Sequence, residues 1–322
     1  MSSDQKDVEA VQELGNKYAQ LQKEIGKVIV GQREVVDLLL LSILCRGHSL
    51  LVGVPGLAKT LLVNSTAEAL GLSFRRIQFT PDLMPSDIIG AEILDQSRNF
   101  KFMKGPLFAN IILADEINRT PPKTQSALLE AMQEKSVTAS GHTYSMADPF
   151  FVLATQNPIE QEGTYPLPEA QLDRFMFHIE VGYPSFDEEV SIVKNTTSEV
   201  HNSIETILQS QEIIYFQDLI RKIPVSDPVY HRAISIAQSS RPDTEQAAEM
   251  TRQYVSWGAG PRASQYLVLG AKAHAALQGR FSPEEQDIRA VAKPILRHRM
   301  VLNYKAEAEG VSIDAIVEGL LA

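Results

Sequence analysis

The sequence predicts an α/β fold in which a five-stranded parallel sheet is covered by helices and followed by a smaller, all-helical domain. Three observations predict it. An apolar segment at residues 48–52 ends in a glycine-rich turn that leads directly into a helix. Four further apolar segments alternate mainly with helical stretches as far as residue 181, which is typical of a doubly wound sheet. Beyond that point the sequence has helical periodicity without strand-like alternation. We therefore predict a first domain at residues 1–183 and a helical domain at residues 184–322.

The composition is that of a globular protein and argues against several other classes. Hydrophobic residues make up 44% and charged residues 22% of the 322 residues, enough for one large domain or two ordinary ones. The formal net charge of −10 argues against a general affinity for nucleic acid or anionic lipid. Cys45 is the only cysteine, which excludes a disulfide framework and a cysteine-based metal site. Because there is no basic, apolar leader and the longest apolar run, 35–44, is too short to span a bilayer, we expect a cytoplasmic protein without membrane insertion.

In the first domain, each element follows from hydrophobic periodicity and flanking residues. Strands are the short apolar runs bounded by turn residues, and helices are the longer stretches with apolar residues three or four apart. The strands are expected at residues 48–52, 74–79, 110–116, 150–155 and 176–181. The helices are expected at residues 8–25, 33–45, 59–70, 85–90 and 124–134. Two inserted hairpins are expected, at residues 91–94 with 100–103 around the turn 95–99, and at residues 136–139 with 142–146.

In the second domain, the helices are expected at residues 187–197, 217–222, 228–239, 262–277, 283–301 and 313–321. Ser282 before Pro283 has the sequence of a helix start. We interpret the tripeptide Arg-His-Arg at residues 297–299 as an exposed helix face, with a contact to a neighbouring subunit as the alternative. Trp257, beside a glycine turn, is interpreted as a packing anchor and not as a binding platform.

The glycine-rich turn at residues 53–60, GVPGLAKT, gives the strongest chemical signal. It matches the phosphate-loop pattern G-x-x-x-x-G-K-[ST], except that Ala58 replaces the second glycine. In such a loop, backbone N–H groups converge at a helix N-terminus, which favours a bound polyphosphate. Lys59 would reach the β- and γ-phosphates, and Thr60 would bind Mg²⁺ through its hydroxyl. The alternative is a plain glycine turn between a core strand and a core helix.

We expect the nucleotide to contact the whole loop and one segment upstream of it. Because alanine tolerates a positive φ poorly, ordinary helical dihedrals are expected at Ala58. Val30 and Gly31 could line the base of the nucleotide or could form a plain turn between two helices. The predicted nucleotide-binding residues are Val30, Gly31, Gly53, Val54, Pro55, Gly56, Leu57, Ala58, Lys59, Thr60, Leu61 and Arg262.

Two carboxylates end the strand at residues 110–116. Asp115 could hold Mg²⁺ and Glu116 could polarise the attacking water, and adjacent residues of a strand are expected to point to opposite sides. Such a pair is common on protein surfaces, but here it follows an unbroken apolar strand. Asn157 ends the next strand, where it could orient the water or serve only as a turn residue before Pro158.

Two arginines, Arg174 and Arg262, are the candidates for neutralising the charge that develops on a transferring phosphoryl group. A guanidinium held in place for this purpose can contribute 10³ to 10⁵ in rate. The predicted catalytic residues are Lys59, Glu116, Asn157, Arg174 and Arg262. The predicted metal ligands are Thr60 and Asp115.

Taken together, these segments resemble the AAA+ ATPases, and among them the MoxR family of the clade with an insert in its second helix. The resemblance covers residues 28–321. Its most specific segments are GVPGLAKT (53–60), LADEINR (113–119), ATQNP (154–158), LPEAQLDRF (167–175) and GPRASQ (260–265). Alanine at position 58 is usual in this family. The resemblance implies an AAA+ phosphate-loop core with a helical C-terminal lid, and ATP and Mg²⁺ as cofactors.

The resemblance also implies roles for single residues and an oligomeric state. In chain order these roles are Val30 and Gly31 beside adenine, Lys59 and Thr60 as Walker A, Asp115 and Glu116 as Walker B, Arg119 as a second arginine at the subunit interface, Asn157 as sensor 1, Arg174 as the arginine finger and Arg262 as sensor 2. A finger that acts in a neighbouring subunit makes hydrolysis depend on assembly, so a homo-oligomeric ring, expected to have six subunits, follows. Both hairpins would face the central pore or a bound substrate. The implied partners are proteins with von Willebrand factor A domains or with metal cofactors to assemble.

Two other functions are open at this point. One is an ATP-binding switch or scaffold with little hydrolysis, against which the intact Glu116, Asn157 and Arg174 argue. The other is a nucleic-acid motor of the same clade. The net charge of −10 and the lack of a separate basic domain in this sequence argue against it, although Arg98, Lys101 and Lys104 make the first hairpin locally basic. We therefore predict a chaperone-like ATPase that remodels or activates partner proteins.

Overall fold

The computed structural model describes residues 3–94, 99–160, 163–197 and 203–322, so most of the predicted turn 95–99 lies outside it. The chain divides into two units. The sheet unit comprises Ala19–Arg174 and Ile179–Ile214, and the helical unit comprises Met1–Tyr18, Phe175–His178 and Tyr215–Ala322. After Arg174 the chain therefore joins the helical unit for four residues before it returns to the sheet unit.

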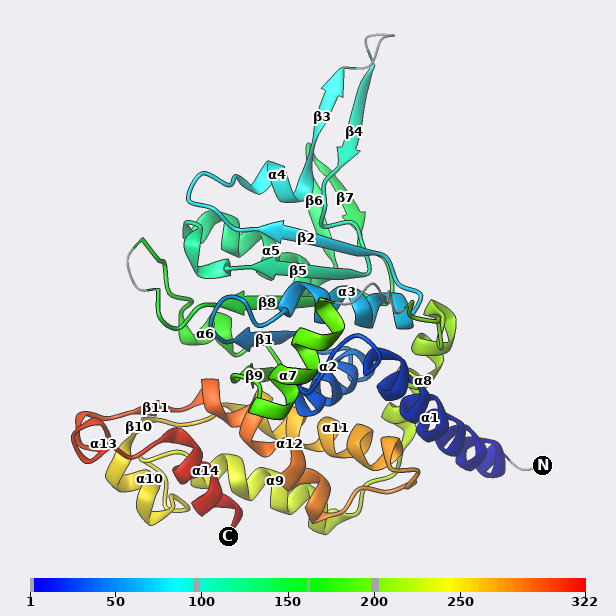
Figure 1. Cartoon of the computed structure of the whole chain (residues 1–322). Helices are drawn as coiled ribbons and strands as arrows, with labels where there is room; N and C mark the ends of the chain where they lie inside the picture. The colour runs from blue at the N-terminus through cyan, green and yellow to red at the C-terminus, as the bar shows by residue number, and fades with distance from the viewer. Residues whose placement is uncertain (1–2, 95–98, 161–162, 198–202) are drawn as a thin grey trace. The chain divides into compact units, whose positions relative to one another are not determined.

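All five predicted strands are confirmed, and they form one sheet in the order β2-β5-β8-β1-β9 (Figure 1). They are β1 (Ser49–Val52), β2 (Phe74–Gln78), β5 (Ile111–Asp115), β8 (Phe151–Gln156) and β9 (Phe177–Glu180). Parallel pairing aligns Gln78 with Asp115, and Val52 with Gln156. The first four residues of β5 are at most 1% exposed, as expected for a strand covered on both faces. This register brings the carboxyl ends of neighbouring strands to one edge of the sheet.

The predicted helices of the first domain are confirmed with small shifts at their ends. They are α1 (Ser3–Ile25), α2 (Arg33–Leu44), α3 (Lys59–Ala69), α4 (Pro85–Ile89) and α5 (Pro122–Glu134). Cys45 follows α2 and is buried, as its apolar surroundings in the sequence suggest. The short elements η1 (Ile117–Arg119) and α6 (Glu169–Leu172) are not predicted, because one helical turn is too short to show a period. None of the described helices is long and apolar enough to cross a membrane.

The two predicted hairpins are confirmed and lie side by side (Figure 1). They consist of β3 (Gly90–Leu94) with β4 (Phe100–Lys104), and of β6 (Ser136–Ala139) with β7 (His142–Ser145). The rings of Phe102 and Tyr144 stack across them, with centroids 4.1 Å apart and planes 16° from parallel. The ring of Phe108 meets Tyr144 edge-on at 6.4 Å. The two insertions are therefore in direct contact through aromatic side chains.

The C-terminal part of the chain is mainly helical, as predicted. Its helices are α7 (Phe186–Thr196), α8 (Ser210–Lys222), α9 (Asp227–Ser239), α10 (Glu249–Tyr254), α11 (Pro261–Leu277), α12 (Glu285–Leu296), α13 (Tyr304–Glu309) and α14 (Ile313–Leu321). It also contains an antiparallel ribbon of β10 (Val255–Trp257) and β11 (Val301–Leu302), which is too short to produce alternation in the sequence. Helix α12 begins after Glu284 and not after Ser282, because the carboxylate of Asp287 accepts the N–H of Glu284 and caps the helix there.

Two interpretations of residues in the helical unit are wrong. Residues Arg297–Arg299 form a 3₁₀ turn, η2, and not an exposed helix face: Arg299 is only 6% exposed. The charge of these side chains suggested exposure, but the guanidinium of Arg299 is satisfied by backbone carbonyls inside the unit. Trp257 is 68% exposed on β10 and is therefore not a packing anchor.

His48, immediately before β1, connects three segments of the sheet unit. Its Nδ1 atom accepts the N–H of Val152 at 3.0 Å, and its Nε2–H donates to the carbonyl of Met132 at 3.2 Å. Its ring also stacks on Phe151. Burial lowers the pKa of His48 to about 4, so the ring is neutral at pH 7. Only the neutral ring can accept the bond from Val152, because a protonated ring has a donor on both nitrogens.

We expect the sheet unit to lose stability as the pH falls from 6.5 to 4. In this range the unfolded chain binds a proton on His48 and the folded chain does not, so protons favour unfolding. The difference in pKa corresponds to about 3 kcal/mol in the free energy of unfolding. His48→Gln should remove this part of the pH dependence, and His142→Gln, at an exposed hairpin residue, should leave it unchanged. Denaturant unfolding at several pH values tests this, and equal pH dependence in wild type and His48→Gln would contradict it.

Candidate functional site

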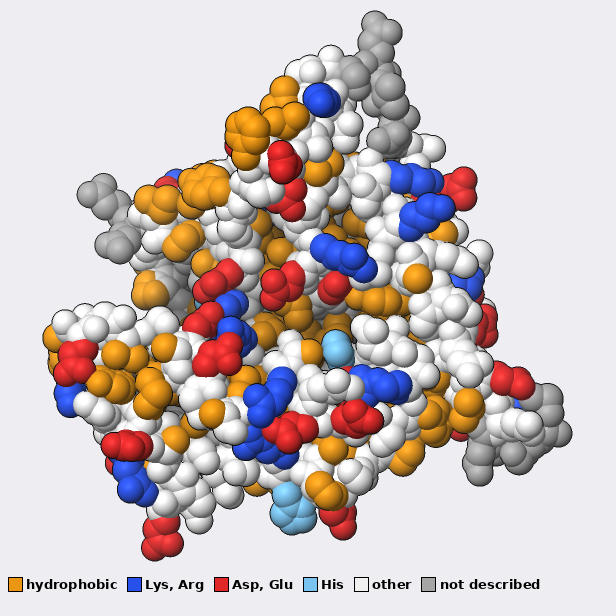
Figure 2. Space-filling model, turned by 60° about the horizontal axis from the view of Figure 1, so that its bottom comes forward, with side chains coloured by type: hydrophobic (Ala, Val, Ile, Leu, Met, Phe, Trp, Pro, Cys, Tyr) orange, Lys and Arg blue, Asp and Glu red, His pale blue; other side chains and the backbone are white. Residues whose placement is uncertain are grey.

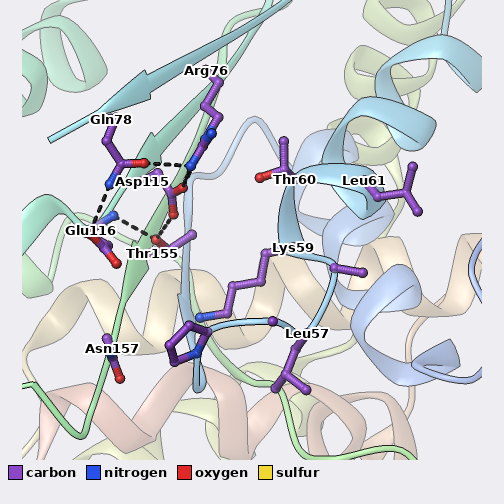
Figure 3. A pocket seen from close by; sticks show the side chains of 13 residues that line it. Leu57, Lys59, Thr60, Leu61, Arg76, Gln78, Asp115, Glu116, Thr155 and Asn157 are labelled. Carbon is purple, nitrogen blue, oxygen red and sulfur yellow. Dashed lines mark hydrogen bonds and ion pairs between the residues drawn. The ribbon is translucent and has the colours of Figure 1, made fainter. Parts of the chain in front are cut away.

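A pocket of about 470 Å³ lies in the sheet unit where β1, β2, β5 and β8 end (Figure 3). The loop between β1 and α3 forms one wall, and side chains from the ends of the other three strands form the opposite wall. The lining residues are Pro55, Gly56, Leu57, Ala58, Lys59, Thr60, Leu61, Arg76, Gln78, Asp115, Glu116, Thr155 and Asn157. The pocket therefore combines the predicted phosphate loop with both carboxylates and the predicted water-orienting amide.

Two residues of the loop have left-handed backbone conformations. Gly56 has φ 87° and Ala58 has φ 54°. The expectation of ordinary helical dihedrals at Ala58 is therefore wrong: the loop geometry imposes a conformation that alanine adopts reluctantly. At Gly53 the requirement is space, since a Cβ atom there would lie 2.7 Å from the carbonyl oxygen of Val181. The tight packing against residue 181 explains why a glycine opens the loop.

Lys59 supplies the positive charge on the side of the pocket formed by the phosphate loop. Its Nζ donates to the carbonyl of Gly53, so the side chain is curled back over its own loop (Figure 3). Burial lowers its pKa, and the charges of Asp115 and Glu116 act in the opposite direction. A phosphate oxygen placed in the loop could replace the carbonyl as the partner of Nζ. The side chain is thus positioned for an anionic ligand.

Asp115 is bonded on both of its oxygens. Oδ1 accepts from the hydroxyl of Thr155 at 2.6 Å. Oδ2 accepts from Arg76, at 2.6 Å from Nη2 and 3.0 Å from Nε. Arg76 also donates from Nη2 to Oε1 of Gln78 at 2.6 Å. The carboxylate is therefore held by a buried hydroxyl from β8 and an exposed guanidinium from β2 (Figure 3).

Glu116 has left the strand, with φ 56° and ψ 52°. The expectation that the adjacent carboxylates point to opposite sides is wrong for this reason, because the turned backbone brings both to the same pocket. Its Oε2 accepts from Nε2 of Gln78 at 2.9 Å and from Nη1 of Arg119 at 3.1 Å. Its N–H donates to the hydroxyl of Thr155 at 2.8 Å. Thr155 thus joins the backbone of Glu116 to the carboxylate of Asp115.

Asn157 lines the pocket and also shapes the turn after β8. Its Oδ1 accepts the N–H of Ile159 at 3.2 Å, which is an Asx turn around Pro158. The two interpretations offered by the sequence, a functional amide and a turn residue, are therefore compatible. Its Nδ2 donates to Oε2 of Glu160 at 3.5 Å, a long bond that a ligand in the pocket could replace.

Several predicted site residues are not among those that line the pocket. Val30 and Gly31 are outside the lining. Gly31 has φ 69°, and a Cβ atom added to it would lie 2.5 Å from Oε1 of Glu188. Val54 belongs to the phosphate loop but is outside the lining, and Gly53 takes part only through its carbonyl. Arg174 follows α6 in the sheet unit, and Arg262 lies in the first turn of α11 in the helical unit.

Three lining residues are missed by sequence reasoning: Arg76, Gln78 and Thr155. Residues 76 and 78 are two apart on β2 and so share one face of that strand, which is a detectable signal once β2 is known to neighbour β5. Nothing in the sequence states which strands are neighbours. Thr155 reads as an ordinary β-branched strand residue, and only the register with β1 and β5 shows that it ends at the pocket.

The chain is similar, over nearly its whole length, to proteins of an ATPase family. Residues 48–177 match the ATPase family associated with various cellular activities (AAA), and residues 247–320 match the AAA lid domain. The chain is 44% identical to Chaperone MoxR1 of Mycobacterium tuberculosis over 305 residues, which are 92% of this chain and 79% of that protein. It is 29% identical to Protein MoxR of Paracoccus denitrificans, over 95% of both chains. A crystal structure from Cytophaga hutchinsonii, described as a candidate ATPase, has a TM-score of 0.91 at 45% identity and covers 97% of this chain and 96% of its own.

Thr155→Val should destabilise the sheet unit and disorder the carboxylate pair. Valine has the same shape but leaves the N–H of Glu116 without its partner, which costs about 1 to 3 kcal/mol in the free energy of unfolding. Thr155→Ser retains the hydroxyl and should lie much closer to wild type. Denaturant unfolding of the three proteins measures the difference. If valine and serine have equal effects, the hydroxyl bridge is not what matters at this position.

Proposed function

Because the chain belongs to the MoxR family of AAA+ ATPases, we propose that it is a chaperone-like ATPase that hydrolyses ATP at the subunit interfaces of a ring to remodel or activate partner proteins. One observation supports the proposal above all. Lys59, Thr60, Asp115, Glu116 and Asn157 come from three separate parts of the sequence and line a single pocket. A pocket that only bound ATP would need no more than the phosphate loop. The two carboxylates and the amide are the additional groups that hydrolysis requires.

The proposed roles follow from where each group lies. The loop N–H groups and Lys59 bind the phosphates. Glu116 accepts a proton from the attacking water, and Gln78 and Arg119, both bonded to Oε2, keep its carboxylate in place. Asn157 orients that water through its amide. Together these groups place a nucleophile against the terminal phosphate.

Mg²⁺ fits the donors present in the same pocket. The hydroxyl of Thr60 and the carboxylate of Asp115 are hard oxygen ligands, and a bound nucleotide and water would complete the set that this ion prefers. The described residues contain no group of three or more His, Cys, Asp or Glu side chains that could hold a metal alone. The ion would neutralise charge on the phosphates when bound. Thr60 and Asp115 are therefore proposed as its protein ligands.

The ring is proposed from the two arginines outside the pocket lining. Arg174 would act as a finger in the ATP site of a neighbouring subunit. Arg262 would sense the γ-phosphate of the nucleotide bound to its own subunit. A hexamer in the cytoplasm, acting on proteins with von Willebrand factor A domains or on metal-cofactor assembly, is the form we propose. A relative named a chaperone supports a protein substrate. The competing function is an ATP-binding assembly switch with little hydrolysis.

The ATPase rate per subunit, measured against protein concentration, tests shared sites. We expect the specific rate of wild type to rise with concentration and both Glu116→Gln and Arg174→Ala to lose at least about a hundredfold, since each removes a group that acts on the transferring phosphoryl. An equal mixture of the two should recover part of the rate, because some interfaces then combine an intact site with an intact finger. A wild type that binds ATP but fails to hydrolyse it at any concentration, even with a partner protein added, would favour the switch.

Arg76→Gln should increase the affinity of the loaded site for Mg²⁺. The guanidinium of Arg76 occupies Oδ2 of Asp115, so removing its charge frees a metal ligand. We expect the half-saturating Mg²⁺ concentration to fall severalfold, both in ATPase assays and in the binding of a fluorescent ATP analogue. Arg75→Gln, on the opposite face of β2 and also exposed, is the matched control. A higher Mg²⁺ requirement in Arg76→Gln would mean that Arg76 holds Asp115 in place and does not compete with the ion.

A further inference from the structure

Arg299 is a buried arginine that donates to the backbone carbonyls of the two residues after Arg174. Its Nη2 donates to the carbonyl of Phe175 at 2.6 Å. Its Nη1 donates to the carbonyl of Met176 at 3.2 Å and also to that of Ile295. All of these residues belong to the helical unit. The guanidinium therefore joins the end of α12 to the two residues that follow Arg174 in the chain.

His298 adds a second donor to the same carbonyl. Its Nε2–H donates to the oxygen of Phe175 at 3.0 Å. Burial, together with the nearby charge of Arg299, lowers the pKa of His298 well below its ordinary value, so the neutral ring makes this bond. The preceding Arg297 makes two bonds to Asp314, at 2.6 and 2.5 Å, which attach η2 to the start of α14. The tripeptide is thus braced on one side and binds residues 175–176 on the other.

The segment that receives these bonds has little other freedom. The side chains of Phe175 and Met176 are completely buried. On the other side of Arg174, its N–H donates to the carbonyl of Gln171 in the turn of α6 at 3.2 Å. Arg174 is therefore followed directly by two buried residues whose carbonyls accept hydrogen bonds from residues 298 and 299. These bonds restrict the position of its Cα atom.

We propose that Arg299, assisted by His298, is a positioning residue for Arg174, which it aims at the ATP site of the neighbouring subunit. The inference rests on the proposed function, in which Arg174 acts on the neighbour's nucleotide. A displacement of the finger by about 1 Å can cost about a hundredfold in rate, which is why such an anchor matters.

A second role for Arg299 is physically reasonable and must be separated from this one. Its guanidinium carbon lies 5.1 Å from the ring centroid of Tyr266, which is on α11 one turn beyond Arg262. Through that contact Arg299 could support Arg262, which would act on the nucleotide of its own subunit. The two roles differ in which subunit suffers when Arg299 is replaced. Subunit mixing distinguishes them.

The experiment uses Arg299→Met, which retains length and apolar packing but removes the donors. Alone, it should reduce the ATPase rate at least about tenfold with little change in the binding of a fluorescent ATP analogue. Mixed with Glu116→Gln, it should recover activity, because the Glu116→Gln subunits supply intact fingers to its intact sites. Mixed with Arg174→Ala, it should recover nothing, because neither subunit then has a working finger. Random mixing would make about one interface in four complete, which limits the expected recovery to about a quarter of the wild-type rate.

The opposite pattern, recovery with Arg174→Ala and not with Glu116→Gln, would overturn the inference and assign Arg299 to its own subunit's site. The mixture of Glu116→Gln with Arg174→Ala reports on the proposed function separately. If that mixture fails to recover, shared sites are wrong; if it recovers while Arg299→Met shows the opposite pattern, only the inference is wrong.

Two further variants keep the test decisive if Arg299→Met fails to fold. Arg299→Lys keeps a charge and can donate to one carbonyl, so it should show the same mixing pattern with a smaller loss. Arg297→Met removes the neighbouring arginine, which binds Asp314 and not residues 175–176. This variant should lose stability without the mixing pattern expected for Arg299→Met. Hydrogen exchange of residues 171–177 should accelerate in Arg299→Lys; unchanged exchange there together with wild-type activity would refute the anchor.

Discussion

The register of the parallel sheet is the constraint on which the site depends. Gln78, Asp115 and Glu116 meet because β2 and β5 pair in one particular register, and Thr155 reaches them because β8 lies on the other side of β5. A slip by one residue would turn every side chain of a strand to its opposite face. The buried residues of β5 oppose such a slip, because their side chains differ in size and each is closely packed against its own face of the sheet. The core of the sheet therefore determines where the polar ends of the strands lie.

Thr155 connects the sheet to the two carboxylates of the site. Its hydroxyl accepts from the backbone of Glu116 and donates to Asp115, so one buried oxygen determines both the turn and the carboxylate. The left-handed turn at Glu116 is strained for a residue with a side chain, and the bond to its N–H helps to offset that strain. The result is that two consecutive carboxylates serve one pocket. Regular strand geometry would have separated them.

The fold and the phosphate loop could be predicted from the sequence because their signals are local. A buried parallel strand is an unbroken apolar run, and a phosphate loop has glycines and a lysine at set spacings. The sequence does not show which strands are neighbours in the sheet. Arg76 and Gln78 look like ordinary polar strand residues until β2 is placed beside β5, and the backbone conformation of Ala58 is imposed by the loop around it. The prediction for residues 297–299 is wrong for the same reason, because charge indicates exposure when the buried hydrogen-bond partners are not visible in the sequence.

The partners of that tripeptide show why a charge is buried there. Residues 175 and 176 lie between α6 and β9 and belong to neither element. Buried carbonyls without donors are costly, by about 1 to 3 kcal/mol each. An apolar side chain at position 299 would suit the buried position but would leave these carbonyls without the donors of Arg299. An arginine at this position donates to both carbonyls and also to the carbonyl of Ile295 in the last turn of α12. A planar guanidinium does so with a defined geometry that a flexible ammonium lacks. The buried charge and the irregular backbone after Arg174 are therefore two parts of one arrangement.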